Sequence, residues 1–136
     1  MNATSSPKAH AILMWIVWFA FLQSVFVVQI AIAKGLPEGQ NIEAPMAAWL
    51  WLICFVPLLV ATIIRWLVLP KMVARHKQLV AMLIGLVCAE APVYFQLFLM
   101  GTDYPQNQIA VLMVAVVCLI QFAPSYATPG YDYKSS

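Results

Sequence analysis

Four long apolar stretches, separated by short polar segments, dominate the chain. They cover about 10–33, 47–70, 79–100 and 108–125. A helix that crosses the hydrocarbon core of a bilayer needs about 20 mostly apolar residues, and each stretch comes close to or exceeds that length. The pattern therefore predicts four transmembrane helices and no soluble domain, with residues 1–136 forming a single unit.

The length and evenness of these stretches favour helices over barrel strands. Within lipid, only helices and closed barrels satisfy the backbone, and barrel strands alternate in polarity over about 10 residues. Short connections make consecutive helices antiparallel neighbours. The predicted fold is therefore an all-α integral membrane protein, a four-helix up-down-up-down antiparallel bundle.

The first stretch is interpreted as a retained span. It runs from Ala11 to Ala33 with Gln23 and Gln29 as its strongly polar interruptions. The segment Ala31-Ile32-Ala33 is similar to a small-residue cleavage site. However, the apolar run before it far exceeds the roughly 7–15 residues of a signal-peptide core.

Composition agrees with a membrane location. The chain has 136 residues, of which 64% are hydrophobic and 9% are charged, whereas soluble domains carry roughly 25% charged residues. The net charge of +2 comes without a basic run interleaved with aromatic residues. Nucleic acid is therefore not expected as a partner, and the lipid bilayer is.

Loop charges predict the orientation. Basic residues occur in the N-terminal tail and the second loop: Lys8, Lys71, Arg75 and Lys77. The first and third loops carry the acidic residues Glu38, Glu43 and Asp103, with Lys34 as the one basic residue of the first loop. Because positive charge stays on the cytoplasmic side, we expect N-in and C-in topology in a cytoplasmic (inner) membrane. The weakly charged tail 131–134 is consistent with this.

Aromatic residues near the span ends are expected to anchor the helices at headgroup depth: Trp49, Trp51, Trp66, Tyr104 and Tyr126.

No cofactor, metal or enzyme signature is found. The cysteines Cys54, Cys88 and Cys118 lie in different spans without a CxxC pair, and neither His10 nor His76 is mid-membrane. The chain contains no HExxH or GxSxG motif. We therefore expect a protein that is not an enzyme and holds no cofactor.

Glu90 is the only carboxylate inside any of the four stretches. At 1.5 Å per residue it lies roughly 16 Å into its span, near the middle of a core about 30 Å thick. An unpaired charge there costs several kcal/mol. Protonation avoids this cost, because burial disfavours the charged form. Pairing with Arg65 of the second span also avoids it, although Arg65 can instead extend toward the cytoplasmic headgroups.

Further polar and helix-breaking residues lie in the four apolar stretches, some of them close to Glu90 in the sequence. Tyr94 is one helical turn from Glu90, and a polar path of Gln23, Glu90, Tyr94 and Gln96 can be drawn. The alternative is ordinary hydrogen bonding between helices. Pro92 removes the hydrogen bond to the carbonyl of Cys88 and so loosens the turn that holds Glu90, or it simply provides a packing kink. Pro57 and Pro124 are expected to interrupt the second and fourth spans.

The segment 89–97 resembles the carboxylate-bearing helix of rotor-ring c subunits of ATP synthases. In that helix a Glu follows small residues and precedes an aromatic residue, a glycine and a leucine. Phe95 and Leu97 match this order, while Gln96 stands in place of the glycine. The resemblance implies a reversible proton or sodium site at Glu90. It does not extend to the glycine-packed second helix of that family, and we do not assign the chain to it.

Two functional hypotheses follow. The first is an oligomeric channel or transport component that handles ions or protons, with a site formed by Glu90, Tyr94, Arg65, Gln96 and Gln23. The alternative is a non-catalytic structural or assembly subunit of a larger membrane complex. We therefore expect the partner to be either further copies of the chain or other subunits.

Overall fold

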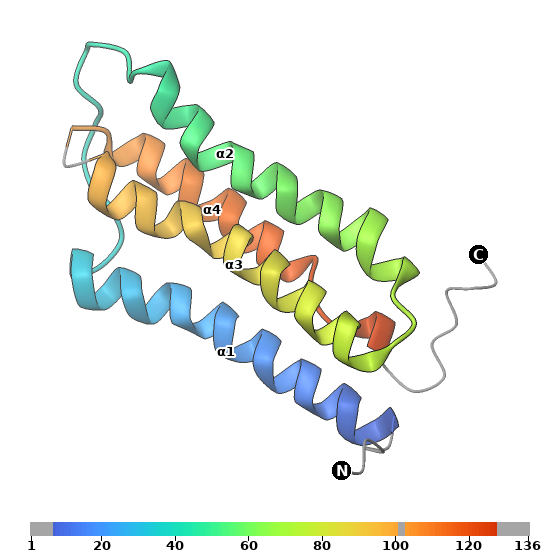
Figure 1. Ribbon diagram of the computed structural model, residues 1–136. Helices are drawn as coiled ribbons and strands as arrows, with labels where there is room; N and C mark the ends of the chain where they lie inside the picture. Colours follow the sequence, from blue (N-terminus) through green and yellow to red (C-terminus); the bar gives the residue numbers. More distant parts are fainter. Residues whose placement is uncertain (1–6, 101–102, 128–136) are drawn as a thin grey trace.

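The structure is a computed structural model that describes residues 7–100 and 103–127 (Figure 1). It contains four α-helices: α1 (Pro7–Ala33), α2 (Ala48–Ile63), α3 (Arg75–Leu99) and α4 (Pro105–Ile120). The described part of the chain has no strand. The all-helical fold predicted from the sequence is confirmed, and the tail 131–134 lies outside the described residues.

Three helical segments are long and apolar enough, by length and composition, to cross a membrane. They are Pro7–Ala33, Ala48–Lys71 and Arg75–Leu99. The second continues α2 through a π-helical turn, η1 (Ile64–Val68), and a 3-10 turn, η2 (Leu69–Lys71). The protein is therefore suited to membrane integration.

Helix α4 is shorter than these three helical segments, and it begins and ends earlier than the predicted span 108–125. It has 16 residues, or about 24 Å at 1.5 Å per residue, against a hydrocarbon core of about 30 Å. Pro105 stands in the first turn, where its fixed φ favours helix initiation. Pro124 follows the helix and does not interrupt it, whereas Pro57 and Pro92 do lie inside α2 and α3.

Successive helices run in opposite directions, as Figure 1 shows. Helix α3 contacts α1, α2 and α4, while α1 and α2 lie on opposite sides of the α3–α4 pair (Figure 1). Consecutive helices are therefore neighbours for α2–α3 and α3–α4 but not for α1–α2. The reason is the longer loop 34–47, which passes over the end of the bundle.

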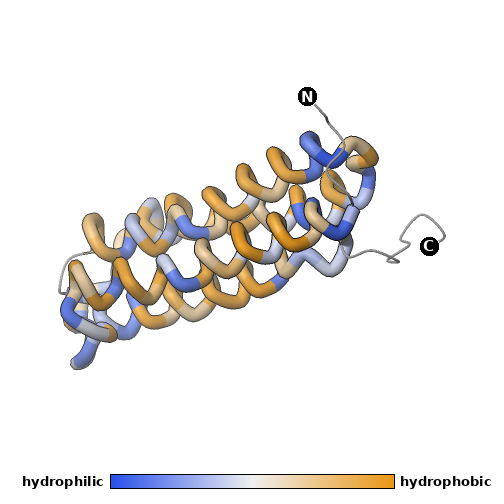
Figure 2. The backbone as a smooth tube through the Cα atoms, turned by 90° about the horizontal axis from the view of Figure 1, so that it is seen from below, coloured by the Kyte–Doolittle hydropathy of each residue, from blue (hydrophilic) through white to orange (hydrophobic). Residues whose placement is uncertain are grey.

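The core runs along the centre of the bundle and is filled by apolar side chains from all four helices. Its fully buried members include Met14, Met82, Leu86, Leu119 and Phe122. Figure 2 shows the apolar middle of the bundle and the hydrophilic positions concentrated toward its two ends. This distribution matches a layer of lipid between two aqueous phases.

Gly85 allows the close approach of α3 to the end of α4. A Cβ atom added at Gly85 would overlap the ring of Phe122, and it would lie 3.3 Å from Cγ2 of Ile64. Phe122 is fully buried, so its ring has no free space to move into. Any side chain at position 85 therefore disturbs the packing of this layer.

We predict that Gly85→Ala lowers the free energy of unfolding. Helix propensity alone would raise it by about 1 kcal/mol, but overpacking of a core costs about 1–3 kcal/mol. Unfolding in detergent micelles, induced by heat or SDS, measures the net effect. As a control, Gly85→Ala in a Phe122→Leu background should cost less, because the ring atoms that collide are gone. Equal or greater stability of the single variant contradicts the packing.

Candidate functional site

Glu90 lies on α3 at the edge that faces α1 and is only 7% exposed. The Ser24 hydroxyl on α1 lies 2.6 Å from Glu90 Oε1. The Tyr94 hydroxyl, one turn along α3, donates to the same oxygen at 3.3 Å. Helix α3 continues unbroken through Pro92. Within the described residues, the carboxyl therefore has two hydroxyl groups as partners and no cationic side chain.

The second carboxyl oxygen of Glu90 reaches the surface of the bundle. Oε2 has no hydrogen-bond partner among the described residues. Oε2 is also not buried. Among the described residues, Gln96 Oε1 is the one buried side-chain polar atom that lacks a hydrogen-bond partner, so the unpaired Oε2 must be accessible from outside the bundle. Glu90 borders a shallow groove of about 370 Å³ on α3, lined also by Val87, Ala91, Tyr94 and Phe95.

The Ser24 hydroxyl can satisfy Glu90 in either protonation state. It lies 2.8 Å from the carbonyl oxygen of Phe21 as well as 2.6 Å from Glu90 Oε1. A hydroxyl has one hydrogen to donate but also accepts. With an ionised carboxylate, Ser24 donates to Glu90. With a protonated carboxyl, Ser24 donates to Phe21 and accepts the hydrogen of Glu90.

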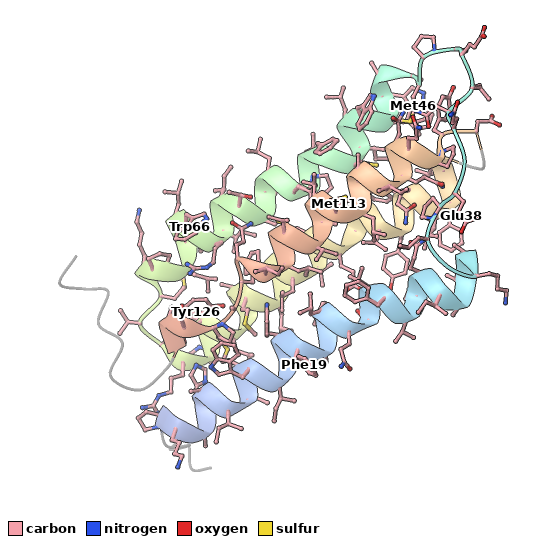
Figure 3. All side chains as sticks on the ribbon, turned by 180° about the vertical axis from the view of Figure 1, so that it is seen from behind. Phe19, Glu38, Met46, Trp66, Met113 and Tyr126 are labelled. Carbon is pink, nitrogen blue, oxygen red and sulfur yellow. The ribbon has the colours of Figure 1, made fainter. Side chains whose placement is uncertain are left out.

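Arg65 is held far from this site, at the end of α4. Its Nε donates to the carbonyl oxygen of Gln121 at 2.5 Å, and Glu90 forms no ion pair with it. The guanidinium lies 4.2 Å from the ring centroid of Trp66 and 4.8 Å from that of Tyr126. Figure 3 shows Trp66 and Tyr126 together at the end of the bundle opposite Glu38.

This placement gives the last carbonyl groups of α4 a hydrogen-bond donor and gives the Arg65 charge a favourable electrostatic environment. The last carbonyls of α4 carry the negative end of the helix dipole and lack helical partners. Arg65 lies in the π-helical turn η1, a type of irregularity that is frequent at functional sites. Burial raises the pKa of the Tyr126 hydroxyl, against the lowering effect of the Arg65 charge.

Gln23 and Gln96 both lie apart from Glu90. Gln23 is exposed on the outer face of α1, beside Phe19 and Ala20. Gln96 is fully buried and donates to Gln29 Oε1 at 2.8 Å. Of the residues predicted for the site, the structure brings together Glu90 and Tyr94 only.

Ser24 is the residue of the candidate site that the sequence analysis missed. It is a small hydroxyl in the middle of the first apolar stretch, next to Gln23, which drew attention instead. Counting residues from the ends of the two spans would have placed Ser24 at the depth of Glu90. The hydrogen bond between them requires in addition that α1 present this face to α3.

Three buried glutamines form a chain of hydrogen bonds near the C-terminal end of α1. Gln29 Nε2 donates to the carbonyl of Gly35 at 3.0 Å, while Gln96 donates to Gln29 Oε1. Gln108 Nε2 donates to the backbone carbonyl of Gln96 at 2.8 Å. Gln96 therefore takes part in ordinary hydrogen bonding between helices, which was the alternative to a polar path through Gln23, Glu90, Tyr94 and Gln96.

We predict that Gln29→Leu destabilises the fold, because it leaves the Gln96 amide buried without its acceptor. An unpaired buried donor costs about 1–3 kcal/mol. Thermal unfolding in detergent measures the loss. Gln23→Leu, the same change on the outer face of the same helix, is the matched control and should leave the unfolding of the isolated protomer unchanged. Equal losses in both variants contradict the bonding scheme.

No match is found when the chain is compared with protein-family models, with curated proteins or with solved structures.

Proposed function

We propose that this protein is a non-enzymatic, multi-pass component of a cytoplasmic membrane that handles protons or another small cation, with Glu90 as the exchanging group. The observation that carries the proposal is the environment of Glu90. Within the described residues, its carboxyl has two hydroxyl partners, no cationic partner and one oxygen without a hydrogen bond. An ionisable residue at membrane depth is a functional candidate by default, and this one is not neutralised by Arg65.

The Ser24 contact favours a proton as the exchanged ion. A site that changes its protonation state needs neighbours that remain hydrogen-bonded in both states, since unpaired polar groups in lipid are costly. Ser24 meets this requirement because its hydroxyl group can rotate. It donates either to the carbonyl oxygen of Phe21 or to Glu90 Oε1. Tyr94 adds a weaker, longer contact to the same oxygen.

The position of Glu90 favours an oligomer over a single-chain channel. Apolar side chains fill the centre of the bundle, whereas Glu90, with its open oxygen, borders a groove on the outside of α3. A path for ions would therefore run along this outer face, between protomers. Several copies would be needed to shield it from lipid.

The arrangement of the loops supports an N-in, C-in topology. The start of α1, the connection between α2 and α3 and the end of α4 lie at one end of the bundle (Figure 1). That end carries Lys8, Lys71, Arg75 and Lys77, and the other carries Glu38, Glu43 and Asp103 with a single basic residue, Lys34. The positive-inside rule then places the basic end in the cytoplasm.

This orientation predicts opposite labelling of two exposed positions, Glu38 in the loop 34–47 and His76 in the first turn of α3. In intact cells, a membrane-impermeant maleimide should label Glu38→Cys but not His76→Cys, and both should react after the membrane is opened. The native cysteines Cys54 and Cys118 are buried, and Cys88 is half-buried in the middle of α3. Both variants are therefore made in a Cys88→Ala background, which gives the baseline. The reverse pattern contradicts the proposed orientation.

The central prediction concerns Glu90→Gln, which keeps the shape of the side chain but cannot lose or gain a proton. In proteoliposomes driven by a potassium diffusion potential, this variant should show at least a tenfold loss of proton flux, followed with a trapped pH dye. Glu38→Gln, in an exposed loop, and Tyr94→Phe, which loses only a 3.3 Å bond, should retain most of it. Normal flux in Glu90→Gln overturns the proposal.

A second candidate function is that of an assembly subunit in a larger membrane complex. It is favoured by the outer face of α1, where large apolar side chains such as Ile16 and Phe19 are more than half exposed. Purification in a mild detergent distinguishes the two. A defined complex with other proteins supports the assembly role, and a stable homo-oligomer supports the proton-handling role.

A further inference from the structure

Gln23 and Glu90 lie at the same depth of the bundle. Gln23 directly precedes Ser24, whose hydroxyl is 2.6 Å from Glu90 Oε1, and one residue along a helix advances only about 1.5 Å. Each has an unused hydrogen-bonding group. The Gln23 amide makes no hydrogen bond to any described residue, and Oε2 of Glu90 has no partner among them.

The two groups face opposite directions and so cannot meet within one chain. Residues that follow one another in a helix are turned by about 100°, so Ser24 borders α3 while Gln23 points outward. Gln23 lies in a shallow groove on α1 together with Trp15, Ile16, Trp18, Phe19 and Ala20. An amide at this depth is exposed to hydrocarbon, which cannot accept or donate hydrogen bonds.

The two grooves match in chemistry as well as in depth. The α1 groove supplies N–H donors from Gln23, and the α3 groove supplies an acceptor, Oε2 of Glu90. Each has an alanine beside its polar residue, Ala20 and Ala91 respectively. Small residues let the backbones of membrane helices approach closely, where packing and polar bonds drive association.

We propose that copies of this chain assemble side by side in the membrane, with the outer face of α1 of one copy in the Glu90 groove of the next. The Gln23 amide then donates to Oε2 of Glu90. Copies inserted in the same orientation bring equal depths together, so the pair forms without a vertical shift. Because the two faces differ, the contact is heterologous and repeats from copy to copy, and a closing rotation makes a ring.

This contact gives Glu90 a partner residue in the neighbouring copy. Any role of the contact in proton exchange rests on the proposed function. It covers Oε2 while leaving Oε1 to Ser24 and Tyr94. A carboxyl protonated on Oε1 presents Oε2 as a carbonyl-type acceptor, and an ionised carboxylate accepts there too. The Gln23 amide is therefore compatible with both states.

Cysteine cross-linking between copies tests the contact directly. Ala20→Cys and Ala91→Cys chains, carrying different tags and expressed together, should form a cross-linked dimer that contains both tags. Every chain in this experiment also carries Cys88→Ala, because the native Cys88 is only half-buried on α3. Neither variant should link when expressed alone, and a chain with both substitutions should give a ladder beyond the dimer. Ala20→Cys with Phe98→Cys is the matched control, because Phe98 is exposed on α3 but lies about 10 Å along the helix from Ala91.

Three cross-linking outcomes overturn the contact. A link in Ala20→Cys alone indicates that α1 packs against α1. An equally strong link to Phe98→Cys indicates random collision, and the absence of a mixed dimer indicates that these faces do not meet.

Association measurements separate this contact from the proposed function. In lipid bilayers, Gln23→Leu should weaken self-association by about 3- to 20-fold, the change expected for one hydrogen bond between membrane helices. Glu90→Gln retains a carbonyl oxygen as acceptor and should associate within about twofold of the parent while losing flux. Unchanged or tighter association of Gln23→Leu overturns the contact. Normal association with normal flux in Glu90→Gln overturns the proton role alone.

Discussion

Hydrogen bonds at four levels attach α1 to the rest of the bundle. The pairs are His10 with Gln78, Trp18 with the carbonyl of Leu119, Ser24 with Glu90, and Gln29 with Gln96. In lipid, apolar surface gains little from contact with another apolar helix, and most of α1 is exposed. These bonds therefore set the rotation and depth of α1. Through them, Ser24 faces Glu90 and Gln23 faces away from the bundle.

The two charged groups within the apolar stretches are stabilised separately. Arg65 is bound by a helix-end carbonyl and two aromatic rings, so it does not neutralise Glu90. Gln121 strengthens that end by accepting from Trp66 and donating to Thr62. Glu90 is left with neutral hydroxyl partners and an open oxygen. This separation is what makes a reversible proton site and a contact between copies physically reasonable at the same residue.

Much of the fold could be predicted from the sequence, because the length and hydropathy of a stretch are enough to indicate a membrane helix. The neighbourhood of Glu90 and Tyr94 was also predictable, since both lie on one helix a turn apart. The partner of Arg65 and the role of Ser24 were not. Helix α1 is apolar around its whole circumference, so its pattern does not reveal which face is buried.

The sequence by itself determined that this chain forms apolar helices, that a single carboxylate lies in the middle of one of them, and that basic loop residues alternate with acidic ones. Only the tertiary structure decided that α1 and α2 lie apart, that Arg65 caps α4, and that Glu90 meets Ser24. The physical reason is that hydropathy and charge are properties of positions along one chain segment. The rotation and pairing of helices instead depend on polar groups far apart in sequence, which find each other only when the bundle packs.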